Sequence, residues 1–282
     1  MKREKRLGII AGSGGIPLCI CRKAKEEGYT CIVAGIQNEF DEGITEQADS
    51  YACFEVKDFL KLVSFFKKKD VHQIIFAGKI RHRNMYSKDT FPLPLSSLLE
   101  GTENRNPDEI ARAVFNYIES QGIEVMDPSR FLSDFFCEQG VLTKGKISPA
   151  AKEDVDYGWP LAKQMADLEI GQTVIVKDKA VVAVEAMEGT DEAIIRGGLL
   201  GGEGCVVVKV ARTRQDARID QPAVGLKTVQ NLKKAGCSAL CIEADKVLFM
   251  NKDKALKLAE QSGITIISRK MDTSLFFMNK SG

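Results

Sequence analysis

The sequence is poor in histidine, with only His72 and His82 in 282 residues, and none of its eight cysteines forms a Cys-x-x-Cys pair. So few imidazoles argue against a histidine-based metal site and against a Ser-His-Asp triad. Most cysteines stand in apolar runs such as 238–242, which is typical of small buried side chains in a reducing compartment rather than of disulfides or zinc ligands. Any metal would therefore have oxygen ligands, which favours magnesium or manganese.

Long hydrophobic runs and a strong charge imbalance are also missing. The apolar run after the basic residues 1–6 breaks at Gly12, and no stretch approaches the roughly twenty apolar residues of a membrane span. The formal net charge of +1 gives no whole-chain argument for nucleic-acid binding. We expect a cytoplasmic protein, and binding to a membrane surface stays open.

The first half of the chain alternates between strand-like and helix-like patterns. The expected strands are 7–11, 30–34, 51–56, 74–78 and 123–125, and the expected helices are 16–27, 58–69 and 107–121. This alternation predicts a parallel sheet wrapped by helices. We therefore expect an α/β protein whose residues 1–135 form a Rossmann-like domain.

The second half begins after a stretch with little periodicity. Gly140, Gly145 and Pro149 predict a linker over 136–149, followed by a C-terminal α/β domain with a mixed sheet over 150–282. The expected helices are 150–168, 191–196, one ending at Gly236, and 252–261. The expected strands are 173–176, 180–185, 205–210, 240–242, 247–249 and 264–267, with turns at 177–179 and around 245–246. The repeated order of hairpin and helix indicates a weak internal repeat.

An acidic residue, Asp220, stands two positions before Pro222, between an expected strand and an expected helix. Because proline fixes φ and disfavours helix before it, Asp220 should lie in an extended loop at a helix start. Arg212, Arg214 and Arg218 resemble an anion-binding collar around it. A carboxylate among arginines suits a metal-assisted reaction on phosphate. The alternative is a solvated acidic turn.

Four small residues, Gly12, Ser13, Gly14 and Gly15, lie between the first strand and the first helix, where backbone N–H groups could bind a phosphate. The loop resembles a dinucleotide fingerprint, but Pro17 occupies the third small position and no ribose-binding acid ends the next strand. A tight turn accounts for one or two of the glycines. Four small residues in succession favour close approach of a nucleotide or sugar phosphate, but not NAD.

Several basic residues are further candidates for phosphate contacts. Gly78 and Lys79 end a parallel strand, on the edge where ligands of such sheets gather, although a lone lysine is often merely solvated. Residues 81–83 add positive charge, and His82 is either a general base or an exposed side chain. Lys209 ends another strand, where it contacts phosphate or serves only solubility.

An acidic cluster spans residues 185–191, at a strand end that leads into a helix. Glu188 and Asp191, together with Asp220, offer the oxygen ligands that magnesium needs. The alternative interpretation is local, with Thr190 as the helix N-cap and Asp191 complementing the helix dipole.

Taken together, these motifs resemble the LpxI type of UDP-2,3-diacylglucosamine pyrophosphatase, from bacterial lipid A biosynthesis. In order along the chain, the motifs are residues 8–17, 76–79, 145–149, 183–191 and 218–225. They cover nearly the whole chain, and the last two are the specific ones. Gln221 stands where the family is expected to have an apolar residue, and Lys79 where it often has asparagine. Neither departure removes a carboxylate.

The resemblance implies that the pyrophosphate of UDP-2,3-diacylglucosamine is cleaved with water, giving UMP and 2,3-diacylglucosamine 1-phosphate. It implies a divalent cation, magnesium or manganese, two α/β domains with the lipid held between them, and Asp220 as the catalytic aspartate. The predicted substrate contacts are Gly12, Ser13, Gly14, Gly15, Gly78, Lys79, Thr190, Lys209 and Arg218. Residues 91–95 either line acyl-chain space or belong to the core. Peripheral contact with the inner membrane and a homodimer are compatible with the resemblance.

Two other classes of protein compete with this interpretation. A non-catalytic nucleotide- or sugar-phosphate-binding module would use Asp220 as a structural cap, and metal-dependent release of UMP would exclude it. An oxidoreductase built on the first domain is disfavoured because no ribose-binding acid follows the second strand.

Overall fold

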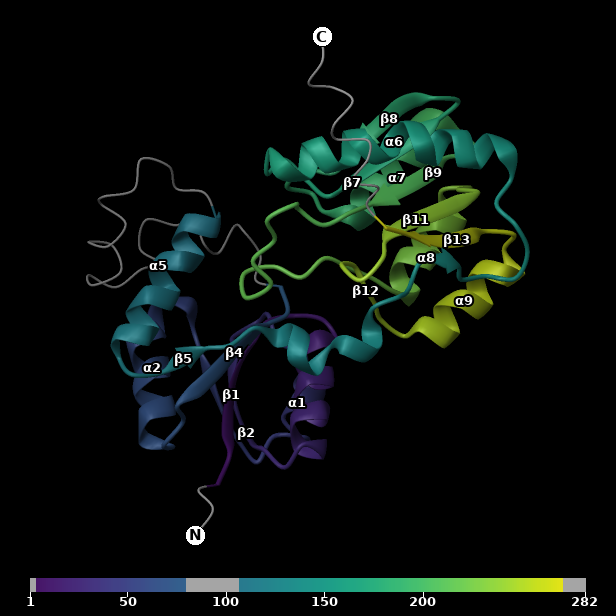
Figure 1. Cartoon of the computed structure of the whole chain (residues 1–282). Coiled ribbons are helices and arrows are strands. Elements are labelled where there is room, and N and C mark those ends of the chain that lie inside the picture. Colours follow the sequence, from purple (N-terminus) through teal and green to yellow (C-terminus); the bar gives the residue numbers. More distant parts are fainter. Residues whose placement is uncertain (1–3, 80–106, 271–282) are drawn as a thin grey trace. The chain divides into compact units, whose positions relative to one another are not determined.

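The computed structural model describes residues 4–79 and 107–270, and the chain divides into two compact units. The first unit comprises residues 1–133 and 216–220, and the second comprises 134–215 and 221–282 (Figure 1). The short segment 216–220, which contains Asp220, therefore folds with the first unit although it lies far along the chain. Among the described residues, no helix combines the length and apolar character needed to cross a membrane.

The first unit contains a five-stranded sheet in which all neighbouring strands are parallel, in the order β3-β2-β1-β4-β5. The strands are β1 (Arg6–Ala11), β2 (Thr30–Ile36), β3 (Ser50–Phe54), β4 (Gln73–Ala77) and β5 (Glu124–Val125), and the helices are α1 (Ile16–Glu26), α2 (Phe59–Lys68) and α5 (Pro107–Ser120). The Rossmann-like parallel sheet predicted from the sequence is confirmed.

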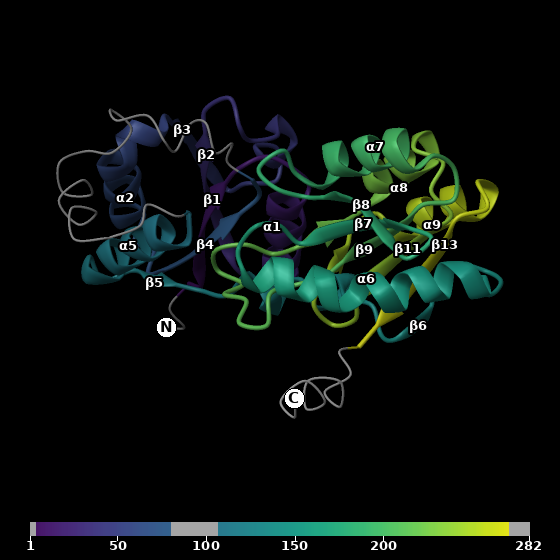
Figure 2. The same ribbon diagram turned by 90° about the horizontal axis from the view of Figure 1, so that it is seen from above.

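Helices cover both faces of this sheet, with α1 on one side and α2 and α5 on the other (Figures 1 and 2). Because successive strand residues point to opposite faces, an almost continuous apolar strand can supply both layers. On the α2 and α5 side, strand residues such as Ile10 and Ile74 share one core with Phe66 and Phe115.

The second unit contains a six-stranded mixed sheet in the order β6-β13-β11-β9-β7-β8. Strands β9, β11 and β13 run parallel, whereas β6, β7 and β8 pair antiparallel, which confirms the predicted mixed sheet. The strands are β6 (Gly140–Val141), β7 (Thr173–Lys177), β8 (Ala180–Val184), β9 (Val206–Lys209), β11 (Ala239–Glu243) and β13 (Thr265–Arg269), and a separate parallel pair is formed by β10 (Ala223–Val224) and β12 (Leu248–Phe249).

Helices cover both faces of this sheet, as Figure 2 shows. The helices are α6 (Pro149–Asp167), α7 (Thr190–Gly201), α8 (Leu226–Lys234) and α9 (Lys252–Gln261). Trp159 of α6 packs with Val206 and Val208, whereas Val207 faces the core shared with α7, α8 and α9. The valine run of β9 is thus buried on both sides.

Three expectations for the second half differ from the structure. The stretch expected to be a linker contributes β6 at the edge of the sheet, and buried Cys137 lies in the core. The helix expected at 191–196 continues to Gly201. The turn around 245–246 does not close a hairpin, because β12 pairs with β10 rather than with β11.

The expected character of the cysteines is confirmed for most of them. All eight are free thiols, and six of them are buried. Burial raises the pKa of the Cys241 thiol to about 12, because a thiolate is poorly solvated in the core.

Candidate active-site residues in the two units

The glycine loop of the first unit lies at the point where the strand order of the sheet reverses. From β1 the chain continues to β2, which lies on one side of β1. Strand β4 lies on the other side of β1, and there Ala11 is beside Ala77. In open α/β sheets this edge is where ligands bind. The structure therefore brings the two predicted phosphate-binding segments, Gly12–Gly15 and Gly78–Lys79, next to each other.

Backbone contact between these segments explains part of the glycine pattern. The N–H of Ser13 donates to the Lys79 carbonyl at 2.8 Å, and the N–H of Lys79 donates back to Ser13 at 3.0 Å. A Cβ on Gly12 would lie 2.5 Å from the Lys79 oxygen, and one on Gly78 would lie 2.6 Å from the Ser13 oxygen. Gly12 and Gly78 are thus required by the chain itself, and their predicted contact with the substrate stays a prediction.

The remaining two glycines leave room for a ligand. A Cβ on Gly14 or Gly15 would have no atom within 4 Å, and both residues are exposed. Gly14 has a φ of 95°, a conformation that favours glycine, whereas Gly15 caps α1 with an ordinary φ of −75°. The first N–H groups of α1 have no partners within the helix, and this terminus favours anions.

Asp220 is half-buried at the end of the segment that folds with the first unit. Its N–H donates to the carbonyl of Asp216 at 3.3 Å, and Ile219 packs against the core of the first unit. Pro222 follows outside the segment and leads directly into β10, so Asp220 does lie in a loop. The loop is a turn rather than an extended stretch, and a strand precedes the helix that begins at Leu226.

Arg218 has two acidic partners and one aromatic partner, all in the first unit. Its Nη2 and Nε donate to the Asp216 carboxylate at 2.9 and 3.1 Å, its Nη1 lies 3.6 Å from Glu119, and its guanidinium stacks 5.3 Å from the Phe115 ring centre. The hydrogen bonds from Arg218 hold the pKa of Asp216 below its ordinary value. Arg212 is likewise paired, 3.6 Å from Glu169. Both arginines thus have acidic partners in this structure, and their part in an anion-binding collar stays a prediction.

A buried polar cluster lies at one edge of the second sheet. Lys209 Nζ donates to Thr190 Oγ1 at 2.7 Å and to Thr173 Oγ1 at 3.3 Å, and it lies 3.6 Å from Glu185 Oε2. The Thr190 hydroxyl donates to Glu185 Oε1 at 2.7 Å. Thr190 and Lys209, predicted substrate contacts, are thus brought together.

Two of the local alternatives are wrong, Thr190 as the N-cap and Lys209 as a solubilising side chain, whereas Asp191 does lie in the first turn of α7, where it complements the helix dipole. The N-cap of α7 is Gly189, with a φ of 86°, so Thr190 is the first helical residue and its hydroxyl turns to Glu185 and Lys209 instead. Lys209 is only 5% exposed, which excludes a role in solubility. A phosphate at Lys209 would have to replace contacts that the ammonium already makes.

Two of the three acidic residues predicted as metal ligands, Glu188 and Asp191, have cationic partners. Glu188 forms a short ion pair with Arg196, and Asp191 lies 2.9 Å from Lys227. Partial burial raises the pKa of Glu188, but hydrogen bonds with backbone N–H groups and with Arg196 outweigh burial and leave the pKa below its ordinary value. Across residues 4–79 and 107–270, no three His, Cys, Asp or Glu side chains gather as a metal site. As placed, Glu188 and Asp191 do not fit a divalent cation.

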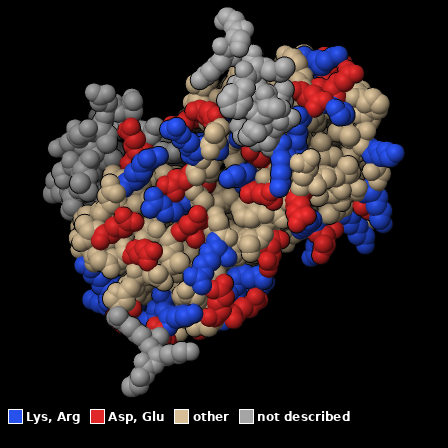
Figure 3. Space-filling view, viewed as in Figure 1, with Lys and Arg blue, Asp and Glu red and all other residues tan. Residues whose placement is uncertain are grey.

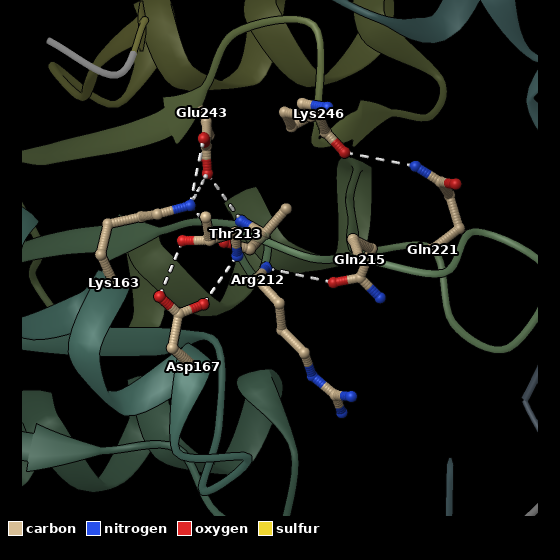
Figure 4. A network of polar contacts seen from close by, with 9 residues as sticks. Lys163, Asp167, Arg212, Thr213, Gln215, Gln221, Glu243 and Lys246 are labelled. Atoms are coloured by element: carbon tan, nitrogen blue, oxygen red, sulfur yellow. Dashed lines mark hydrogen bonds and ion pairs between the residues drawn. The ribbon is translucent and has the colours of Figure 1, made fainter. Parts of the chain in front are cut away.

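A polar network that the sequence reading missed holds the start of the loop between β9 and β10 (Figure 4). Buried Lys163 of α6 and buried Glu243 of β11 both bind the backbone of Ala211, and Asp167 of α6 binds Thr213. An acid at the end of a parallel strand was the available signal for Glu243. For Lys163 and Asp167, the available signal was their spacing of one helical turn, which places both side chains on the same face of α6.

Charges of both signs are interspersed over the face shown in Figure 3, as expected from a net charge of +1. Several predicted candidates, at 81–83 and 91–95, lie outside the described residues.

Comparison with known proteins covers both units. The sequence model of the LpxI N-terminal domain matches residues 6–135, and that of the LpxI C-terminal domain matches residues 138–267. A curated relative, the UDP-2,3-diacylglucosamine pyrophosphatase LpxI of Caulobacter vibrioides, is 25% identical over 278 residues, which cover 93% of this chain and 97% of the relative.

Solved structures give weaker likenesses. The UDP-glucose 4-epimerase of Brucella ovis with NAD has a TM-score of 0.30 at 12% identity, covering 43% of this chain and 34% of the epimerase. A transformylase from Mycobacterium tuberculosis has a TM-score of 0.28 at 10% identity, covering 64% of this chain and 44% of its own. TM-scores this low support no conclusion about the fold or the function of this chain. The two domain matches, in order and over nearly its whole length, show that the chain belongs to the LpxI family.

Proposed function

We propose that the protein hydrolyses the pyrophosphate bond of UDP-2,3-diacylglucosamine, releasing UMP and 2,3-diacylglucosamine 1-phosphate for lipid A synthesis. The observation that carries this proposal is the ordered match to both LpxI domains over residues 6–135 and 138–267. The name of the Caulobacter relative, similar along 97% of its own length, supports the same reaction.

In this proposal the first unit binds phosphate at the edge where β1 and β4 end. The N–H groups of Gly14 and Gly15 and the start of α1 bind phosphate oxygens, because a helix N-terminus favours negative charge. Exposed Lys79 adds a positive charge beside them. Asp220, in the same unit, orients the attacking water or accepts its proton.

The proposal includes a divalent cation, magnesium or manganese, which would lower the electrostatic barrier to attack of water on the diphosphate. In our proposal Asp220 is the principal protein ligand of this cation, whereas Glu188 and Asp191 are paired with Arg196 and Lys227. We therefore expect Glu188→Gln to retain activity at the same cation concentration, whereas excess chelator stops the wild-type protein.

Release of UMP from UDP-2,3-diacylglucosamine tests the proposal. We expect Asp220→Asn and Asp220→Ala to lower turnover on the order of a hundredfold or more, because a lost general base or metal ligand removes transition-state stabilisation. Melting temperatures should stay near that of the wild type, since a half-buried loop carboxylate contributes little to the core. Near-normal turnover in folded Asp220→Asn would contradict the catalytic assignment.

The alternative function, a binding module without catalysis, makes a different prediction for the wild-type protein. It would bind the sugar nucleotide and release no UMP at any cation concentration. If UMP is released, running the reaction in oxygen-18 water and asking which product carries the label identifies the phosphorus that water attacks.

A further inference from the structure

The loop that carries Asp220 leaves the second sheet after β9, and a buried ion pair binds its first turn. Lys163 Nζ donates to the Ala211 carbonyl at 2.6 Å, and the Ala211 N–H donates to Glu243 Oε2 at 2.9 Å. Lys163 and Glu243 also contact each other at 3.1 Å. Both backbone polar groups of Ala211 are therefore held by side chains, at the point where the chain leaves the sheet.

A second anchor lies one helical turn further along α6. Asp167 accepts hydrogen bonds from the Thr213 N–H and from the Thr213 hydroxyl, each at 2.7 Å (Figure 4). Because one carboxylate binds both the backbone and the side chain of Thr213, it restrains the direction in which the loop continues.

The stability of α6 does not explain why an aspartate occupies this position. Asp167 is exposed and is the last residue of the helix, where the partial negative charge of the helix end disfavours a carboxylate. The Lys163–Glu243 pair is also weak as a stabilising feature, because removing both charges from water costs about as much as their attraction returns. What the two anchors share is the segment 211–213.

The other end of the loop is fixed as well. Gln221 donates to the Lys246 carbonyl at 3.2 Å, and the Pro222 carbonyl accepts from the Leu248 N–H at 2.9 Å. Between these ends, Arg218 and Ile219 hold the segment 216–220 in the first unit. Releasing Thr213 would lengthen the free stretch that leads into this segment, and a longer free stretch samples more conformations.

We infer that Asp167 is a positioning residue for Asp220, acting through Thr213, with Lys163 and Glu243 supporting the same segment. Only the expected effect on kcat rests on the proposed function, whereas the anchoring of Thr213 by Asp167 does not depend on it. Asp167 touches no reacting atom in this role. Its loss should lower kcat, because small displacements of a catalytic group are costly, and should leave KM nearly unchanged.

Three variants test this role. Asp167→Ala removes both hydrogen bonds. Asp167→Asn preserves them, because Oδ1 can accept from the Thr213 N–H while the amide nitrogen donates to the hydroxyl. Glu153→Ala is the matched control, since exposed Glu153 lies on the same helix and pairs with Lys179, away from the loop. We measure kcat and KM for UMP release, melting temperature, and amide hydrogen exchange of residues 211–222.

For Asp167→Ala we expect kcat to fall on the order of tenfold, with faster exchange over residues 211–222 and an unchanged melting temperature. Asp167→Asn and Glu153→Ala should match the wild type in all readouts. Unchanged exchange in Asp167→Ala would overturn the inference, and so would equal loss of kcat in Asp167→Asn. A wild-type protein that releases no UMP would remove the proposed function, while the exchange measurement would still decide the anchoring.

Discussion

At the scale of single residues, the glycines after β1 have different physical causes. Gly12 is required because a Cβ would lie 2.5 Å from the Lys79 carbonyl oxygen, whereas Gly15 has ordinary backbone angles and open space around it. If ligand approach explains Gly15, Gly15→Val should raise KM for the sugar nucleotide without changing the melting temperature. Steady-state kinetics and thermal melting measure the two effects.

Gly12→Ala is the contrasting variant. Its new methyl group must displace the Lys79 backbone, so we expect a loss of about 1–3 kcal/mol in the free energy of unfolding. A Gly15→Val protein with unchanged KM would show that the loop is only a turn.

At the scale of elements, the segment 216–220 contains an ion pair between Arg218 and Asp216, two positions apart. Arg218 lowers the pKa of Asp216, so the folded state binds the proton of that carboxyl less readily than the unfolded chain does. The stabilisation is present above the ordinary aspartate pKa, near 4, and is lost as pH falls through the lower folded value. We expect the difference in unfolding free energy between the wild type and Asp216→Asn to shrink from pH 6 to pH 3. Urea unfolding measures it, and a difference independent of pH would contradict this account.

At the scale of the whole molecule, the first compact unit is discontinuous in sequence, because it takes 216–220 from the second half of the chain. A fragment of residues 1–135 lacks Asp220 and the side chains that pack on Phe115 and Glu119. A fragment of residues 145–282 keeps Asp220 and the pair of Arg218 with Asp216, but it lacks Glu119 and Phe115, the other contacts of Arg218. Neither fragment alone should release UMP, and full activity from the second fragment would refute a need for the first unit.

Much of the architecture follows from local sequence patterns. The apolar strands of both halves and most helices lie where periodicity predicted them, because burial on both faces of a strand requires a nearly continuous apolar run. The glycine loop and Gly78 were expected at the carboxyl edge of a parallel sheet, and they meet there. Their role in binding, like that of Asp220, stays a prediction.

Side-chain partners are what the sequence could not supply. Arg218 pairs with Asp216 and Glu119, and Glu188 pairs with Arg196. The Lys163–Glu243 pair joins residues 80 positions apart. Periodicity reports which face of an element is buried, because burial repeats along the chain, whereas an ion pair depends on which elements become neighbours. The sequence by itself thus determined the strands, the helices and the family resemblance, and only the tertiary structure decided which charges meet and which loop they hold.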